Sequence, residues 1–175
     1  MNFISRPLIR AILLLTLLSQ SHARDHVLIT GGNRGIGLAL VKQYLSKGSV
    51  VFTTCRNQET SKELRALDNK HLHILQVNFL DPHPEDKVKK FLAGTPVDIL
   101  IHNASLFPYR VNKLPKLDTS EWLDAFKINV ISPIKISISL KQNLRDSNHK
   151  KLVFISSRRA SNNVNIKDNY RGRIG

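Results

Sequence analysis

A glycine-rich stretch near the N-terminal end of the sequence combines residue types that suit the binding of a phosphate group. The stretch reads Thr30-Gly31-Gly32-Asn33-Arg34-Gly35-Ile36-Gly37. Glycine lets a backbone approach a bound anion closely, and the free amides at the start of a following helix point toward it. An apolar run precedes the stretch and a segment of helical period follows it. We predict that residues 26–47 hold the pyrophosphate of a dinucleotide; a tight turn without a ligand is the alternative.

A second group of residues bears on which dinucleotide would bind. About twenty residues beyond the glycines, folds that bind NAD usually carry an acidic residue that contacts the ribose hydroxyls. This sequence has Cys55, Arg56 and Asn57 there. An acid would repel a 2′-phosphate, whereas a guanidinium pairs with it bidentately, and Arg34 could reach the same phosphate. We therefore expect NADP(H) rather than NAD; a solvated loop charge at Arg56 is the alternative.

The elements that would position these residues alternate between strands and helices. We predict strands at His26–Thr30, Ser49–Cys55, His71–Asn78, Val97–His102 and Lys151–Ser156. Each run is apolar enough to be buried on both faces, as inner parallel strands are. Helical stretches are predicted at Ile36–Ser46, Glu59–Leu67, Glu85–Leu92 and Thr119–Leu144. The fold class is therefore α/β, a doubly wound parallel sheet or Rossmann fold of about five strands, with ligands beyond the carboxyl ends of the strands.

The helical stretch Thr119–Leu144 has the clearest period. Its apolar residues recur at steps of three or four, at Trp122, Ala125, Phe126, Val130 and Ile134. Pro133 is expected to bend this helix or to open its hydrogen-bond ladder. A homo-oligomer formed through the 119–144 helix is a further expectation.

Several motifs together resemble the short-chain dehydrogenase/reductase family. They are the glycine pattern Thr-Gly-x-x-x-Gly-Ile-Gly, Asn103-Ala104 after the fourth strand, Asn129 in the long helix, and Ser156-Ser157 after the fifth strand. The resemblance extends from His26 to about Ser157. Within the family, residues 155–159 are most similar to the carbonyl-reductase-type, C-factor-like or sniffer-like branch.

The resemblance implies which residues contact the cofactor. It assigns Gly31, Gly35 and Gly37 to the pyrophosphate and Asn103-Ala104 to the ribose and the strand end. Two positions depart from the family pattern, because Ser105 replaces a glycine and Asn78 replaces the usual aspartate beside adenine. The full expected cofactor-binding set is Gly31, Asn33, Arg34, Gly35, Ile36, Gly37, Arg56, Asn57, Asn78, Phe79, Asn103, Ala104 and Ser105.

The resemblance also implies a reaction, which is hydride transfer between nicotinamide and a small carbonyl or alcohol substrate. Asn129 would help to seat a water, Ser157 would bind the substrate oxygen, and Tyr170 would be the general acid. A lysine should follow the tyrosine by four residues and lower its pKa, but Ile174 stands there. In the sniffer-like register, Arg173 occupies the tyrosine position.

Two explanations of this incomplete motif stay open. One is an oxidoreductase interrupted before its last strands, so that residues 24–175 form an NAD(P)-binding Rossmann domain that is incomplete at the C-terminus. The other is a catalytically inactive dinucleotide-binding fragment or pseudoenzyme.

Composition limits the remaining function classes. The chain has 175 residues, room for one domain, and a net charge of +14 with a pI near 10.3. Such a charge favours anionic ligands. The basic residues are nevertheless scattered, and no arginine-rich arm or zinc-ligand spacing accompanies them, so no nucleic-acid partner is expected. No metal site is expected either, and the single cysteine excludes an intramolecular disulfide.

Residues 1–23 have the pattern of a signal peptide or an N-terminal extension. Two arginines precede the apolar run Ala11–Leu18, and a small-x-small cleavage site follows at residues 21–23. The run is well short of the ~20 residues that span a bilayer, so no stable transmembrane span is expected. Fold and cofactor favour a cytoplasmic location, whereas a genuine signal peptide would imply export.

Overall fold

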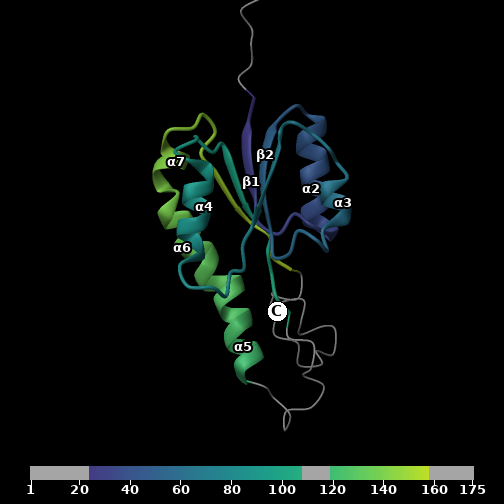
Figure 1. Ribbon diagram of the computed structural model, residues 1–175. Coiled ribbons are helices and arrows are strands. Elements are labelled where there is room, and N and C mark those ends of the chain that lie inside the picture. The colour runs from purple at the N-terminus through teal and green to yellow at the C-terminus, as the bar shows by residue number, and fades with distance from the viewer. Residues whose placement is uncertain (1–23, 108–118, 158–175) are drawn as a thin grey trace, which may run out of the picture.

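The computed structural model describes residues 24–107 and 119–157, in which parallel strands alternate with helices (Figure 1). The strands are β1 (His26–Ile29), β2 (Val50–Cys55), β3 (Leu72–Gln76), β4 (Ile99–His102) and β5 (Lys151–Phe154). The helices are α2 (Gly35–Ser46), α3 (Lys62–Arg65), α4 (Pro84–Leu92), α5 (Thr119–Phe126), the π-helix η2 (Lys127–Ile131), α6 (Ser132–Ser139) and α7 (Lys141–Arg145). The expected signal peptide at residues 1–23 lies outside these ranges.

The five strands form one parallel sheet in the order β3-β2-β1-β4-β5. Its register pairs His26 of β1 with Val50 of β2, and Val27 with Ile99 of β4. The chain winds from β1 to β3 in one direction and then returns to place β4 on the other side of β1. This reversal confirms the predicted doubly wound α/β fold and creates the crevice in which such sheets bind ligands.

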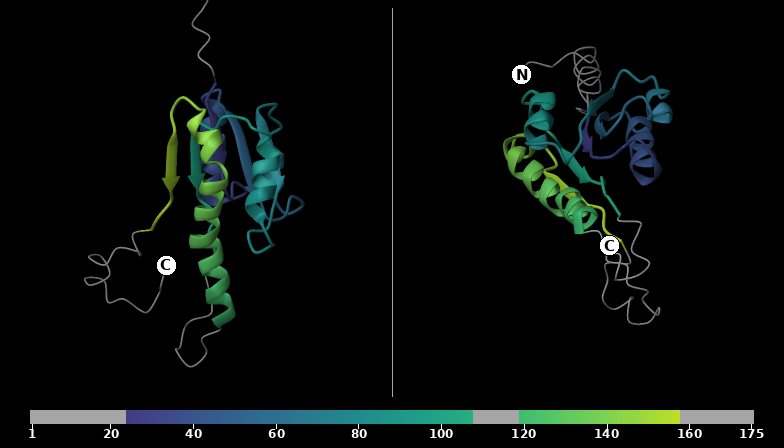
Figure 2. Two further views of the ribbon diagram at one scale, coloured as in Figure 1. Left: turned by 90° about the vertical axis from the view of Figure 1, so that its left-hand side faces the viewer. Right: turned by 60° about the horizontal axis from the view of Figure 1, so that its bottom comes forward.

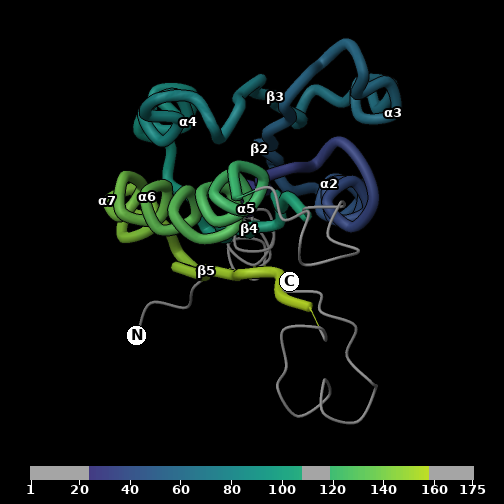
Figure 3. Tube along the Cα trace, turned by 90° about the horizontal axis from the view of Figure 1, so that it is seen from below, coloured from purple at the N-terminus to yellow at the C-terminus, as the bar shows by residue number. Residues whose placement is uncertain are grey.

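Helices cover both faces of the sheet, α2 and α3 on one side and α4, α6 and α7 on the other (Figures 1 and 3). Alternate residues of β1 point to opposite faces, so Val27 and Ile29 pack with Val41 of α2. Leu28 packs in the opposite layer with Val88 of α4. All five side chains are fully buried. Each buried aliphatic side chain of this size contributes roughly 1.5–3 kcal/mol through the hydrophobic effect.

The expectation that every strand is buried on both faces is wrong for the two edge strands. Residues of β3 are half-buried or exposed, and those of β5 are all exposed. The reason is the strand order, since β3 and β5 each have a single neighbour among the described strands. Figure 2 shows β5 at the margin of the fold. Phe154 in β5 remains 54% exposed despite its apolar side chain.

The long predicted helix forms, but only part of its expected apolar stripe is buried. Ala125, Ile136 and Leu140 are buried, whereas Phe126, Val130 and Ile134 are exposed. The helix changes pitch at η2, where the Ser132 amide donates to the Lys127 carbonyl five residues earlier. The additional residue in this wider turn rotates the following helix relative to a continuous α-helix. Within the described ranges, no helix is long and apolar enough to cross a membrane.

Pro133 accounts for the place of this wider turn. In an α-helix the amide of residue 133 would donate to the carbonyl of Asn129, and proline has no amide hydrogen. The ladder is therefore opened at Asn129, as the sequence predicts, while the helix continues through η2 into α6 (Figure 2, left).

A buried carboxylate ties three segments together at the end of the sheet where the strands begin. Asp98 accepts hydrogen bonds from the backbone amides of His26 (2.9 Å), Asn148 (3.0 Å) and His149 (3.3 Å). Burial would raise the pKa of Asp98, but these amides stabilise the charged form and hold the pKa below its usual value. The same turn is joined to Asp25 by His149, with 3.2 Å between Nε2 and Oδ1.

His102, at the end of β4, is a buried imidazole. Its Nε2 lies 2.9 Å from the Ser137 hydroxyl, which itself donates to the Pro133 carbonyl at 2.7 Å. Because that hydroxyl proton is already engaged, His102 donates from Nε2, and its buried Nδ1 has no partner. The ring also stacks on Phe154 at 4.9 Å. Burial lowers the pKa of His102 to about 4.

We predict that His102→Asn flattens the dependence of stability on acid pH. The unfolded chain takes up a proton near pH 6.5 and the folded chain only near pH 4, so the free energy of unfolding falls over that window as the pH drops. This contribution is about 3 kcal/mol, and the substitution removes it. Urea denaturation at pH 7 and pH 4.5 measures the difference. His73→Asn is the control for lost stacking, because His73 stacks on Phe52 in an exposed position. An unchanged slope in His102→Asn contradicts the prediction.

Candidate dinucleotide-binding site

Gly31 and Gly35, in the turn between β1 and α2, are glycines for different reasons. Gly31 adopts a φ of +71°, and a Cβ there would lie 2.9 Å from the Cα of Ala104. Gly35 adopts a φ of +55° with open space around it, so only its backbone conformation demands glycine. The first glycine thus lets β1 approach the segment after β4, and the second turns the chain into the helix.

Gly37 lets α2 pack directly on the turn. A Cβ at this position would overlap the carbonyl oxygen of Gly31 and would lie 2.5 Å from the side-chain nitrogen of Asn103. Both contacts are far closer than a real Cβ tolerates. Glycine at this position therefore brings the amides at the start of α2 over the end of β1.

Asn103 joins the ends of β1 and β4. Its side-chain nitrogen donates to the carbonyls of Gly31 (2.9 Å) and Thr30 (3.1 Å). In return the Thr30 hydroxyl accepts hydrogen bonds from the backbone amides of Asn103 (3.0 Å) and Ala104 (3.1 Å). These four hydrogen bonds fix the glycine turn against the wall that follows β4.

Two threonines of β2 hold the turn from the opposite side. The amide of Gly31 donates to the Thr54 hydroxyl at 3.0 Å, and the Thr53 hydroxyl donates to the Ile29 carbonyl at 2.9 Å. The sequence analysis did not select these residues. The available signal was the pairing of Ile29 with Thr53, which places polar side chains of an otherwise apolar strand beside the turn.

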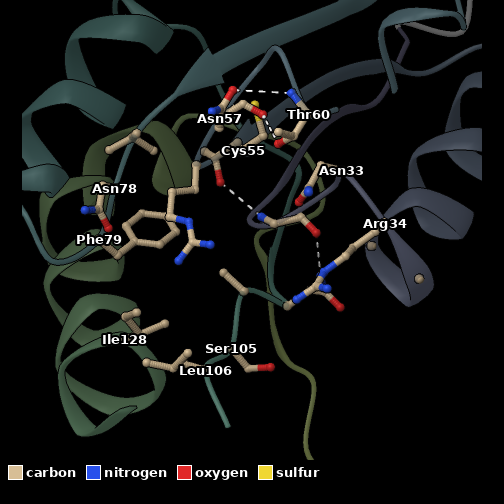
Figure 4. A pocket seen from close by; sticks show the side chains of 18 of the residues that line it. Asn33, Arg34, Cys55, Asn57, Thr60, Asn78, Phe79, Ser105, Leu106 and Ile128 are labelled. Carbon is tan, nitrogen blue, oxygen red and sulfur yellow. Dashed lines mark hydrogen bonds between the residues drawn. The ribbon is translucent and has the colours of Figure 1, made fainter. Parts of the chain in front are cut away.

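A cavity of about 770 Å³ opens beyond the carboxyl ends of the strands, a volume typical of small-molecule sites. Every residue of the expected cofactor-binding set lines it. Residues that the sequence analysis missed also line it, namely Thr54, Cys55, Thr60, Val77, Leu106 and Ile128. Figure 4 shows Asn78 and Phe79 on one side of this space and Arg34 on the other.

The electrostatics of the cavity favour an anion. Among the described residues, its only charged lining side chains are Arg34 and Arg56, both exposed. Helix α2 begins at the cavity, and neither a side-chain cap nor an acidic residue occupies its first turn. Its first amides thus have no intrahelical partner and carry the positive end of the helix dipole. The glycine cradle and these positive groups fit a dinucleotide pyrophosphate.

Two predicted contact residues spend part of their hydrogen-bonding capacity within the protein. Asn78 accepts a hydrogen bond from the Leu80 amide at 3.2 Å, which orients its carboxamide at the cavity wall. Asn57 accepts from the amides of Glu59 and Thr60. The neighbouring Cys55 thiol is buried, which raises its pKa, while a hydrogen bond with Ser61 acts in the opposite direction.

Of the three expected catalytic residues, the structure describes Asn129 and Ser157. Asn129 is committed to Leu106, since its Oδ1 accepts from the Leu106 amide at 2.8 Å and its Nδ2 donates to the Leu106 carbonyl at 2.9 Å. It therefore positions the cavity wall after β4. Ser157 is exposed beyond β5 and is not among the lining residues. Tyr170 lies outside the described residues. Across residues 24–107 and 119–157, no cluster of three metal-ligating side chains occurs.

Comparison with known proteins identifies the family. The model of the short chain dehydrogenase family matches residues 25–172. An uncharacterized oxidoreductase of Schizosaccharomyces pombe is 33% identical over 134 residues, which are 74% of this chain and 53% of that protein. The 3-oxoacyl-acyl-carrier-protein reductase of Escherichia coli is 26% identical over 132 residues, with the same two shares. The chain thus spans about half the length of the curated relatives it matches.

Solved structures agree with this result. A carbonyl reductase from Pseudomonas aeruginosa superposes with a TM-score of 0.73 at 26% identity, over 82% of this chain and 66% of that one. Its complex with NADP gives 0.71 at 25% identity over the same shares. Because the family model covers more than half of the sequence and the fold matches independently, the chain belongs to the short-chain dehydrogenase family.

Proposed function

We propose that residues 24–175 act as a dinucleotide-binding domain of an NADP(H)-dependent oxidoreductase acting on a small carbonyl or alcohol substrate. The observation that carries the proposal is the cavity, which the glycine cradle, the start of α2 and Arg56 line together. Membership of the family and the likeness to a carbonyl reductase solved with NADP support it. When bound, the nicotinamide supplies or accepts the hydride.

This chain's own residues would bind and orient the dinucleotide. Backbone amides at Gly35 and Gly37 would face the pyrophosphate. Asn103 would keep the turn in place through its hydrogen bonds to the Thr30 and Gly31 carbonyls. Val77 and Phe79 offer an apolar wall beside Asn78, which suits the adenine end. These groups act by position and charge, and they are fixed before the ligand arrives, which limits the entropy lost on binding.

The preference for NADP(H) over NAD follows from the charges around the cavity. In the part of the chain that the structure describes, no acidic side chain lines the cavity to accept a hydrogen bond from a free 2′-hydroxyl. A guanidinium at Arg56 or Arg34 would instead pair with a 2′-phosphate, and within the described residues no ion pair joins either arginine to a carboxylate. Their positive charge is thus available to a ligand.

We predict that Arg56→Asp weakens NADPH binding selectively. A lost charge-assisted pairing costs about 1.5–3 kcal/mol, which corresponds to roughly a tenfold to hundredfold increase in Kd. NADH lacks the 2′-phosphate, so its Kd is not expected to rise, and an acid at this position can accept hydrogen bonds from the ribose hydroxyls. Fluorescence titration of both nucleotides at one salt concentration measures the effect.

Gly37→Ala provides the contrasting variant. A Cβ at this position would displace the pyrophosphate turn, so the affinities for NADPH and NADH should both fall. Equal NADPH affinity before and after Arg56→Asp would remove Arg56 from the site. Absence of binding by the unsubstituted chain would overturn the proposed function itself.

Turnover decides between an oxidoreductase and a dinucleotide-binding protein without catalysis. We predict that the full chain oxidises NADPH in the presence of small aldehydes or ketones, and that absorbance at the nicotinamide band decreases in step with alcohol formation. Tight NADPH binding without turnover across a broad carbonyl panel would contradict catalysis and support the inactive alternative. Asn129→Ala should lower both NADPH binding and turnover, because it removes the two hydrogen bonds that hold Leu106 in the cavity wall.

We also propose that a second copy of the chain covers the exposed stripe of α5, η2 and α6. Phe126, Val130, Ile134 and Ile138 follow one another at steps of four and are 38–69% exposed. Such a row forms a ridge that can pack into the matching groove of a second helix. The basic residues beside it are paired, Lys127 with Asp124 at 3.8 Å and Lys135 with Glu85 at 3.2 Å, so the ridge itself is not a concentration of unpaired charge.

We predict that Ile134→Glu shifts the chain from dimer to monomer, because the introduced carboxylate would be desolvated in the interface. Sedimentation velocity at several protein concentrations reports the change. Gln43→Glu makes the same charge change on α2, away from the stripe, and should leave association intact. A monomeric unsubstituted chain at all concentrations would contradict this part of the proposal.

A further inference from the structure

The loop after β2, which presents Arg56 to the cavity, is folded around the carboxamide of the next residue. Asn57 Oδ1 accepts hydrogen bonds from the backbone amides of Glu59 (2.7 Å) and Thr60 (3.3 Å). Its backbone carbonyl accepts from the hydroxyls of Thr60 (3.3 Å) and Ser61 (2.6 Å). Figure 4 shows the Asn57 side chain directed toward Thr60. Asn57 is therefore the centre of the loop's own hydrogen bonds.

The next residue attaches this loop to the sheet. The amide of Gln58 donates to Gln76 Oε1 at 3.3 Å, and its side-chain nitrogen is 3.5 Å from the Ile74 carbonyl of β3. On the other side of Arg56, Cys55 is the last residue of β2 and is 2% exposed. The backbone of Arg56 is thus held at both neighbours while its side chain remains exposed.

We infer that Asn57 is a positioning residue that determines the selectivity for the 2′-phosphate through Arg56 and not by touching the nucleotide. This inference rests on the proposed NADP(H) function. With the loop folded in advance, binding a phosphate orders only the arginine side chain. Without the Asn57 carboxamide, binding must also order the backbone of the loop, and that loss of conformational entropy opposes association.

The neutral carboxamide satisfies two requirements at one position. Capping backbone amides in this way needs a side-chain oxygen, which asparagine, aspartate and serine all provide. Aspartate would add a negative charge beside the arginine and would compete with the phosphate for it. Asparagine provides the oxygen without that charge. Substitutions at this position can therefore test the effect of the capping oxygen and the effect of the charge independently.

The first test compares Asn57→Ala with Asn57→Ser in the full chain. Asn57→Ala is expected to raise the Kd for NADPH about tenfold and the Kd for NADH less than twofold, since NADH makes no 2′-phosphate contact. Asn57→Ser restores an oxygen and is expected to recover most of the NADPH affinity. Fluorescence titration gives both constants, and circular dichroism verifies that each variant is folded.

Asn69→Ala is the matched control. Asn69 Oδ1 accepts from the amide of His71 at 2.9 Å in the turn before β3, and Asn69 does not line the cavity. Its loss removes a cap of the same kind, so the melting temperature should fall while the ratio of the NADPH and NADH constants stays unchanged. If Asn69→Ala changes that ratio as much as Asn57→Ala does, the inference is overturned. A general loss of stability would then explain the effects of both substitutions.

Asn57→Asp at about 0.5 M salt separates positioning from direct contact. Salt screens the added charge, so only the cap remains, and NADPH should bind within about twofold of the unsubstituted chain at the same salt. If Asn57→Asp and Asn57→Ala bind NADPH equally weakly under these conditions, the Asn57 amide nitrogen contacts the nucleotide. That result would contradict a positioning role.

The inference and the proposed function fail in different ways. If NADPH is preferred and Arg56→Asp abolishes the preference while Asn57→Ala preserves it, only the inference is overturned. If the unsubstituted chain shows no preference for NADPH, the proposed NADP(H) selectivity fails, and the inference falls with it.

Discussion

The site depends on a close approach of three backbone segments that a single methyl group would prevent. Helix α2, the end of β1 and the segment after β4 meet at Gly37, where a Cβ would overlap the Gly31 carbonyl. That carbonyl is in turn the acceptor for Asn103 at 2.9 Å. The direction of α2 depends on keeping these segments in contact, because moving the helix outward would also move its first amides away from the crevice.

The part of the site that could be predicted from the sequence is the glycine turn, where the local residue pattern and the order of strands and helices indicate the same structure. The glycine turn is both a strand-to-helix connection and an anion cradle, and every residue expected to contact the cofactor lines one cavity. The sequence predicted a bend or an opened ladder at Pro133, but it did not indicate that Phe126 and Ile134 would be exposed, since a continuous helix suggests one buried face. Pro133 was the relevant signal, but the wider turn it accommodates depends on the carbonyl of Asn129.

Other features could not be predicted because they arise from neighbours distant in sequence. The sequence analysis treated β3 and β5 like the inner strands, since an edge position is a property of strand order and not of composition. Thr53 and Thr54 became part of the site only through their pairing with the end of β1. Asn57 was expected among the cofactor contacts and lines the cavity, but its hydrogen bonds to the loop that carries Arg56 could not be predicted.

The Asp98 carboxylate has a consequence for the order in which the fold is completed. Its partners His26 and His149 are 72 and 51 residues away along the chain, so it joins the first and last strands of the described fold. During synthesis, β1 to β4 emerge before residues 148 and 149. Thr30, Gly31 and Asn103, which fix the pyrophosphate turn, are therefore all present before the Asp98 carboxylate gains its last two partners.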